Sequence, residues 1–202
     1  PGGQLSYLNH YLYKINELTD ARRGHSVDRN LIIRTKGLSV VASAAAVLMS
    51  MGSVGYRTCC RTCQLCYHGA RVQLDGTITK EKADELYYGL KEKDELIVDQ
   101  LVAQAVLSIS EQFVERMRNN QIYKALSKDP GGKNGRFGSG FRKEYKFLKR
   151  LYDNILNKKA FESRARSNLK KRLKSIYHKL FATDVFISSD EAQFLLLIDQ
   201  II

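Results

Sequence analysis

Residues 37–56 are GLSVVASAAAVLMSMGSVGY, a stretch without a charged side chain, flanked by Arg34 and Lys36 before it and by Arg57 and Arg61 after it. Its length permits a helix that crosses a membrane. Alanine, serine and glycine fill much of it, however, and their transfer into hydrocarbon is weakly favourable or unfavourable. The composition favours a tightly packed central helix, because small residues let helices approach closely in either solvent.

Apolar residues at helical spacing continue outward from this stretch. Residues 5–18 carry one apolar stripe, and Thr77 or Thr79 begins a long helical pattern that ends near residue 120. Two further stripes lie in residues 141–155 and 161–180. The chain has only two prolines, and its β-branched runs are short and isolated, so little forbids long helices and a sheet is the second choice. The predicted fold is all-α, a helical bundle of about six helices.

The clearest break is the glycine-rich segment SKDPGGKNGRFGSG at residues 127–140, which contains Pro130. It matches no phosphate-binding loop spacing, so a flexible basic linker is favoured over a nucleotide site. It divides the chain into a near-neutral helical part at 1–126, with the apolar helix and the cysteines, and a unit at 141–202. That second unit is a basic helical hairpin followed by an apolar C-terminal helix, which Ser188 and Glu191 begin with a capping box.

The positive charge is concentrated in the second unit. The formal net charge is +12, and residues 142–181 hold 14 of the 33 basic residues but only 3 of the 21 acidic ones. Such a concentrated field attracts polyanions, although a solvated helix face is the alternative. The residues predicted to bind an acidic partner are Lys146, Lys149, Arg150, Arg164, Arg166, Lys170, Lys171, Arg172 and Lys174.

Four cysteines fall within residues 59–66, which is not the pattern of a secreted disulfide framework. Three interpretations stay open. The cysteines are small buried residues on one face of a continuing helix, or Cys60, Cys63 and Cys66 are acylated beside an apolar segment. In the third, the same three residues bind a metal with His68, although closed zinc sites usually draw their ligands from two separated segments.

Neither a calcium site nor a catalytic motif is evident. The residues DGTIT at 75–79 resemble the middle of a calcium loop, but Arg71 and Lys82 would then stand where oxygen ligands belong. No cofactor is therefore expected. His10, His25, His68 and His178 are dispersed, and no HExxH or GxSxG occurs, which predicts that the chain is not an enzyme.

The leading functional prediction is a non-catalytic helical interaction module that docks on an anionic membrane surface through its basic hairpin. The alternative is an RNA- or DNA-binding structural subunit of a larger assembly, with Tyr145, Tyr152 and Tyr177 as stacking groups. An enzyme with an unrecognised site ranks third. The predicted partners are an anionic lipid surface or nucleic acid, with protein partners in addition, and the predicted location is intracellular with membrane association. Since the chain starts at Pro1 without an initiator Met, it is expected to be a processed, excised or recombinant piece.

Overall fold

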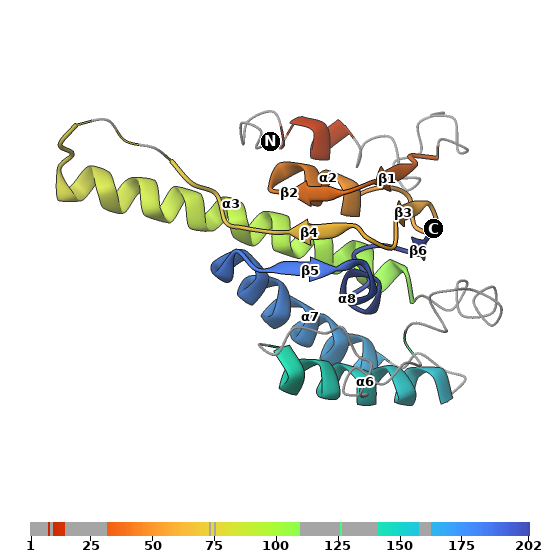
Figure 1. The fold of residues 1–202 in the computed structure, drawn as a ribbon. Helices are drawn as coiled ribbons and strands as arrows, with labels where there is room; N and C mark the ends of the chain where they lie inside the picture. The colour runs from red at the N-terminus through yellow and green to blue at the C-terminus, as the bar shows by residue number, and fades with distance from the viewer. Residues whose placement is uncertain are drawn as a thin grey trace, which may run out of the picture.

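The structure is a computed structural model that describes residues 8, 10–14, 32–72, 74, 76–109, 126, 141–157 and 163–202. Its strands are β1 (Thr35–Gly37), β2 (Val40–Ala42), β3 (Arg57–Cys59), β4 (Gln64–Cys66), β5 (Phe186–Ser188) and β6 (Gln200–Ile201). Its longer helices are α2 (Ala44–Ser50), α3 (Lys80–Leu107), α6 (Arg142–Asn157), α7 (Ser163–Thr183) and α8 (Ser189–Phe194). Figure 1 shows their arrangement.

Two three-stranded sheets lie at the centre of the fold, so the prediction of an all-α bundle is wrong. One sheet has the order β1-β3-β6 and is parallel throughout. The other has the order β2-β4-β5, in which β2 and β4 are parallel and β5 is antiparallel to β4. The chain is therefore of mixed α and β content.

Residues 37–56 form several short elements and not one helix. The β-branched pair Val40 and Val41 enters β2, the alanine-rich part forms α2, and Gly55 turns the chain with a φ of 93° before β3. Gly52 is needed for close packing, because a Cβ there would lie 2.7 Å from Thr35 Oγ1. Among the described helices, none is long and apolar enough to cross a membrane.

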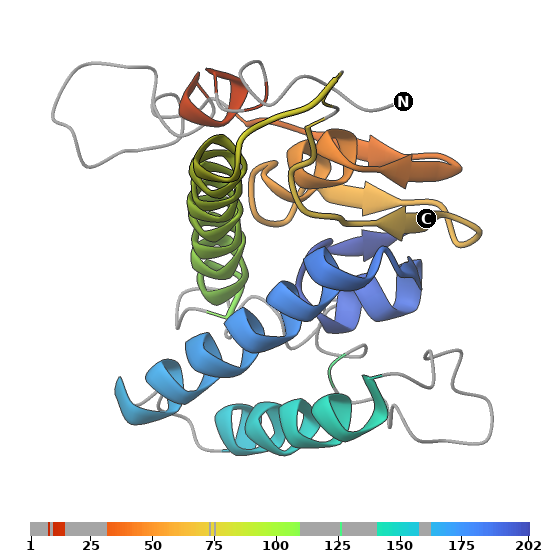
Figure 2. The same cartoon turned by 90° about the vertical axis from the view of Figure 1, so that its left-hand side faces the viewer.

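The helical stripes of the sequence are largely confirmed. Thr79 caps α3, accepting the N–H of Lys82, and α3 runs through Gly89 without a break but ends at Leu107, earlier than the predicted end near residue 120. The two stripes after the linker form α6 and α7. Figure 2 shows α3 and α7 beside the sheets, and α6 lying along α7 and farther from them.

The C-terminal end differs from its prediction. The capping box of Ser188 and Glu191 is present, but α8 is short, and the chain turns at Leu195 and Leu196 to reach β6. Strands β5 and β6 complete the two sheets that begin within residues 35–66. The predicted linker at 127–140 lies outside the described residues, and the division into 1–126 and 141–202 stays a prediction.

Candidate active site

Ser43 lies at a sharp turn between β2 and α2, with φ 61° and ψ −136°. This backbone conformation is rare for a residue with a Cβ and costs on the order of 1–3 kcal/mol. Hydrogen bonds on both sides impose it. The N–H of Ser43 donates to the Cys66 carbonyl at 2.9 Å, and its own carbonyl accepts from Ala46 N at 3.0 Å.

The hydroxyl of Ser43 does not cap the helix that follows, although serine is a preferred N-cap residue. The N-caps of α3 and α8, Thr79 and Ser188, adopt extended backbone conformations, and each accepts a backbone N–H through its side chain. The strain at Ser43 is therefore not offset by a cap. A serine on a strained strand-to-helix turn is the arrangement that presents a nucleophilic hydroxyl in α/β-hydrolases.

The register of the β2-β4-β5 sheet brings a histidine and a carboxylate to the same end as Ser43. Ala42 pairs with Cys66 in the parallel ladder, and Cys66 pairs with Phe186 in the antiparallel one. Two residues beyond Cys66 comes His68, and two residues before Phe186 comes Asp184, which lies in the turn after α7, so both residues flank the same end of the ladder. This is the end where β4 continues toward α3 in Figure 1.

His68 is half-buried, and its Nδ1 lies 2.8 Å from the carbonyl oxygen of Gly69. A carbonyl oxygen only accepts, so Nδ1 is the donor, and in the neutral ring Nε2 then has the lone pair. This is the tautomer that a general base requires. The segment after His68 is fixed, because Gly69 N–H donates to the Phe181 carbonyl at 2.8 Å and Ala70 N–H to Asp94 Oδ1 at 2.8 Å.

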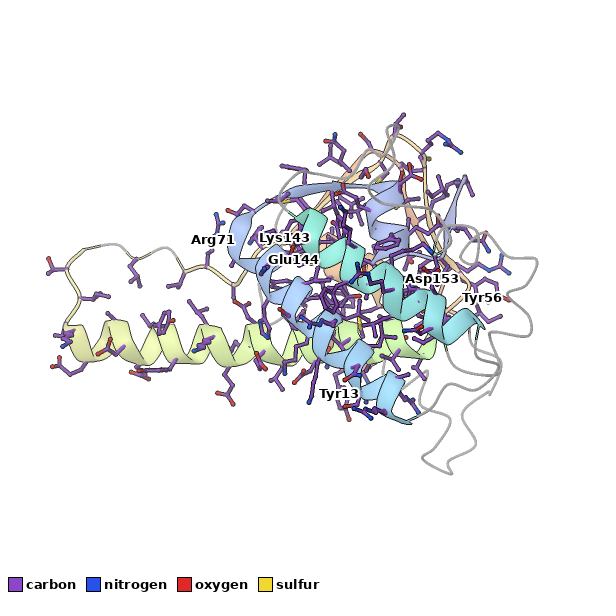
Figure 3. The ribbon with its side chains drawn as sticks, turned by 90° about the horizontal axis from the view of Figure 1, so that it is seen from below. Tyr13, Tyr56, Arg71, Lys143, Glu144 and Asp153 are labelled. Carbon is purple, nitrogen blue, oxygen red and sulfur yellow. The ribbon has the colours of Figure 1, made fainter. Side chains whose placement is uncertain are left out.

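Asp184 has a positive φ of 49° and an exposed carboxylate that is paired with the Arg71 guanidinium. Figure 3 shows Arg71 near the C-terminal end of α7, which Asp184 follows. Ser43, Asp184 and Leu196 are the described non-glycine residues with positive φ, and two of these three lie at this end of the sheet. Ser43, His68 and Asp184 thus follow or precede strands that end at the same edge of this sheet.

This arrangement was not predicted from the sequence. Ser43 was expected in the interior of a helix, and His68 was interpreted as a dispersed histidine or a metal ligand. The available signal was the change from β-branched Val40 and Val41 to helix-forming Ala44 on either side of a serine. Without the strand pairing, nothing in the sequence connects Ser43 with residues 25 and 141 positions later.

The cysteines do not share a helix face, so that interpretation is wrong. Cys59 ends β3 and Cys66 ends β4, which belong to different sheets. Burial raises the thiol pKa of Cys59, Cys63 and Cys66, and Cys60 is partly exposed. Within the described residues, no group of three or more His, Cys, Asp or Glu side chains could hold a metal ion. Acylation stays a prediction. Among the three predicted residues, Cys60 is the most accessible to an acylating enzyme, because Cys63 and Cys66 are buried.

The predicted basic residues lie on α6 and α7, and some of them are already paired. Lys149 pairs with Asp153, while Lys174 bridges Glu95 and Asp99 on α3. None of the nine is buried: Lys149 and Lys174 are partly exposed, and the other seven are exposed, being Lys146, Arg150, Arg164, Arg166, Lys170, Lys171 and Arg172.

A groove of about 300 Å³ opens between the two helices and is lined by Phe147, Leu151, Asn168, Lys171 and Arg172. The Arg172 guanidinium lies 4.5 Å from the centre of the Phe147 ring. The proposed stacking groups are not available, because Tyr145, Tyr152 and Tyr177 are fully buried.

No protein-family profile matches the chain, and no curated protein does. Among solved structures, the chain is similar to the ClpP protease catalytic domain from Plasmodium falciparum, with 16% identity and a TM-score of 0.47. The match covers 100% of this chain and 63% of that one. The chain therefore spans less than two thirds of the length of the structure it resembles.

The prediction of a non-catalytic, all-α membrane-docking module is corrected by these findings. The fold has two sheets, and none of the described helices is long and apolar enough to span a membrane. The prediction that the chain is not an enzyme is withdrawn with it, whereas an anionic partner for the basic residues of α6 and α7 stays a prediction.

Proposed function

We propose that the chain is a serine hydrolase in which Ser43 is the nucleophile, His68 the general base and Asp184 the carboxylate that orients the imidazole. One observation carries the proposal. Ser43 has a strained backbone that no side-chain cap offsets, and it lies at the same sheet end as a histidine whose Nδ1 is within hydrogen-bond distance of a backbone carbonyl. Strain of this kind persists where the surrounding structure holds it, and it clusters at functional sites.

The chemistry is acyl transfer. His68 Nε2 takes the proton from Ser43 Oγ while Oγ bonds to the carbonyl carbon of an ester or amide. The carbonyl electron pair moves to its oxygen, which the N–H of Ala44, the residue after the nucleophile, is placed to meet. The imidazolium then returns the proton to the leaving group as the carbonyl re-forms, which leaves an acyl-serine. Water, deprotonated by the same nitrogen, releases the acid.

An activity-based phosphonate probe tests the proposal, because it reacts with activated serines and not with ordinary hydroxyls. We expect covalent labelling of the purified chain, with the adduct located at Ser43 by peptide mass spectrometry. Ser43→Ala and His68→Gln should abolish labelling. Ser39→Ala is the matched control, since Ser39 is exposed and lies four residues before the nucleophile. Absence of a Ser43 adduct, or an adduct that survives His68→Gln, would show that the proposal is wrong.

An anionic partner for the basic face of α6 and α7 stays a separate prediction, which does not depend on the hydrolase proposal. Its support is the density of cations and the groove beneath Lys171 and Arg172. Replacing Lys170, Lys171 and Arg172 by Glu should weaken binding to anionic vesicles or to RNA over a salt series. Binding that is equal in the variant, or absent near physiological salt, would contradict the prediction.

A further inference from the structure

Asp94 is a half-buried carboxylate on α3 that faces the backbone immediately after His68. Its Oδ1 accepts the N–H of Ala70 at 2.8 Å. Its Oδ2 lies so close to Gly69 that a Cβ at that position would be only 2.6 Å away. Burial raises the pKa of Asp94, whereas the Ala70 N–H and the nearby His68 and His178 lower it. The carboxylate is therefore held against this one short segment.

The peptide unit between Gly69 and Ala70 connects Asp94 with His68. Its N–H is the donor to Asp94, and its C=O, which belongs to Gly69, is the acceptor for His68 Nδ1 at 2.8 Å. In a planar trans peptide the N–H and the C=O point in opposite directions. When Asp94 fixes the direction of the N–H, it also fixes the direction of the carbonyl that holds the imidazole.

We infer that Asp94 is a positioning residue for His68, acting through the Gly69–Ala70 peptide to hold the imidazole as the Nδ1–H tautomer. The inference rests on the proposed hydrolase function and adds a second carboxylate to it. Asp184 is the carboxylate proposed to orient the imidazole from the β5 side, and Asp94 acts from the α3 side through the backbone. The hydrogen bonds run in series, in which each donor polarises the next.

Glycine at position 69 is part of the same arrangement. A side chain there would displace the Asp94 carboxylate, since its Oδ2 and Cγ lie 2.6 Å and 3.5 Å from the ideal Cβ position. The N–H of Gly69 is meanwhile held by the Phe181 carbonyl of α7. The segment after His68 is thus fixed from two helices, and Figure 2 shows α3 and α7 on either side of the region where β4 leaves the sheet.

Two variants separate the acceptor role of Asp94 from its charge. Asp94→Asn keeps an oxygen that can accept the Ala70 N–H, whereas Asp94→Ala removes it and frees the peptide to rotate. Asp99→Ala is the matched control on the same helix, because Asp99 pairs with Lys174 and does not touch the segment after His68.

The first measurement is the tautomer of the His68 ring, read from its nitrogen-15 resonances above neutral pH and assigned with His68→Gln. We expect the Nδ1–H form in the unchanged chain, in Asp94→Asn and in Asp99→Ala, and a mixture with the Nε2–H form in Asp94→Ala. The second measurement is the rate of phosphonate labelling at Ser43. It should fall about tenfold or more in Asp94→Ala and be largely rescued in Asp94→Asn, since general-base catalysis depends on a correctly placed lone pair.

The outcomes distinguish the two proposals. If the unchanged chain is labelled at Ser43 but Asp94→Ala keeps both its labelling rate and its Nδ1–H tautomer, the positioning role is wrong and the hydrolase function stands. If the unchanged chain is not labelled, the hydrolase function is wrong, and the tautomer measurement still decides whether Asp94 orients His68. Equal loss in Asp94→Asn and Asp94→Ala would overturn the peptide mechanism in favour of a charge effect.

Discussion

The Arg57 guanidinium and the Asp199 carboxylate form a buried ion pair, with Nη2 2.6 Å from Oδ1 and Nε 2.9 Å from Oδ2. The remaining guanidinium N–H groups donate to the Ser108 hydroxyl and to two backbone carbonyls. The second carboxylate oxygen accepts two backbone N–H groups near the start of β3. This network connects β3, the segment before β6 and the end of α3, and all of its members are hydrogen-bonded.

Removing either partner should be strongly destabilising. Arg57→Met leaves the Asp199 carboxylate buried without a counter-charge, and Asp199→Ala does the same to the guanidinium. Breaking a buried pair in this way costs about 3–5 kcal/mol. Urea denaturation measures the loss in the free energy of unfolding. Lys82→Ala breaks the exposed pair with Glu85 and should change stability little; comparable losses in the two cases would contradict the prediction.

Replacing Ser43 by glycine should stabilise the fold while it removes labelling by the phosphonate probe. Glycine adopts the observed φ and ψ without the Cβ clash, so we expect a gain of about 1 kcal/mol after the greater chain entropy of unfolded glycine is subtracted. Ala45→Gly, in the exposed first turn of α2, is the control, and should lose about 1 kcal/mol. A loss of stability in Ser43→Gly would mean that the turn is not strained.

Two glycines should respond oppositely to alanine. A Cβ at Gly37 would lie 2.7 Å from Cys59 Sγ and 2.8 Å from Met49 Sδ, so Gly37→Ala overpacks the core and should cost about 1–3 kcal/mol. Gly89, within α3, has nothing within 4 Å of the same position, and Gly89→Ala should gain about 0.5–1 kcal/mol. Thermal denaturation of both variants checks this. Adding Cys59→Ala to Gly37→Ala should recover part of the loss if the thiol contact is its cause.

The fold should lose stability in alkaline solution. Burial raises the pKa of the Cys59 thiol and of the Tyr67, Tyr152 and Tyr177 phenols above their ordinary values. These groups stay neutral in the folded chain while the unfolded chain releases their protons, so their contribution is complete below about pH 8.5 and declines as the pH rises. The decline reaches about 1.4 kcal/mol per pH unit for each titrating group. Urea midpoints between pH 8 and 10.5 test this, and a midpoint constant over that range would contradict it.

Periodicity in the sequence was sufficient to predict the long helices. The stripes of α6 and α7, the Thr79 cap and the Ser188–Glu191 box depend on local spacing, which the sequence displays directly. The strands were missed because each has only two or three residues, too few for an alternating pattern. Strand β6 pairs with β3 across 142 positions of sequence, and such pairing leaves no local signal.

The candidate site depends on the same non-local pairing. Ser43 is a candidate nucleophile because of its backbone angles, and His68 is a candidate base because it follows Cys66 at the end of the ladder. Neither property is visible in residue types, since a serine in an alanine-rich segment is also ordinary in a packed helix. The positive charge of residues 142–181 was visible in the sequence, but its distribution over ion pairs with α3 required the structure.

Arg71 should restrain the proposed site, because its guanidinium pairs with the Asp184 carboxylate that is proposed to orient His68. Arg71→Ala releases the carboxylate to accept a hydrogen bond from the imidazole. The side chains are 64% and 45% exposed, and exposed pairs contribute about 1 kcal/mol or less. The labelling rate at Ser43 should therefore rise by up to about fivefold, the factor equivalent to 1 kcal/mol.

Salt and a double variant test this prediction. Added salt screens an exposed pair, so the labelling rate of the unchanged chain should rise with ionic strength while that of Arg71→Ala stays nearly constant. In the Asp184→Asn background, Arg71→Ala should bring no gain, since the carboxylate it would release is gone. Arg61→Ala is the control for loss of an exposed cation, because Arg61 lies at the turn between β3 and β4, away from Asp184. An equal gain in both backgrounds would show that Arg71 acts on the nucleophile by its general charge, and that its pair with Asp184 does not restrain the site.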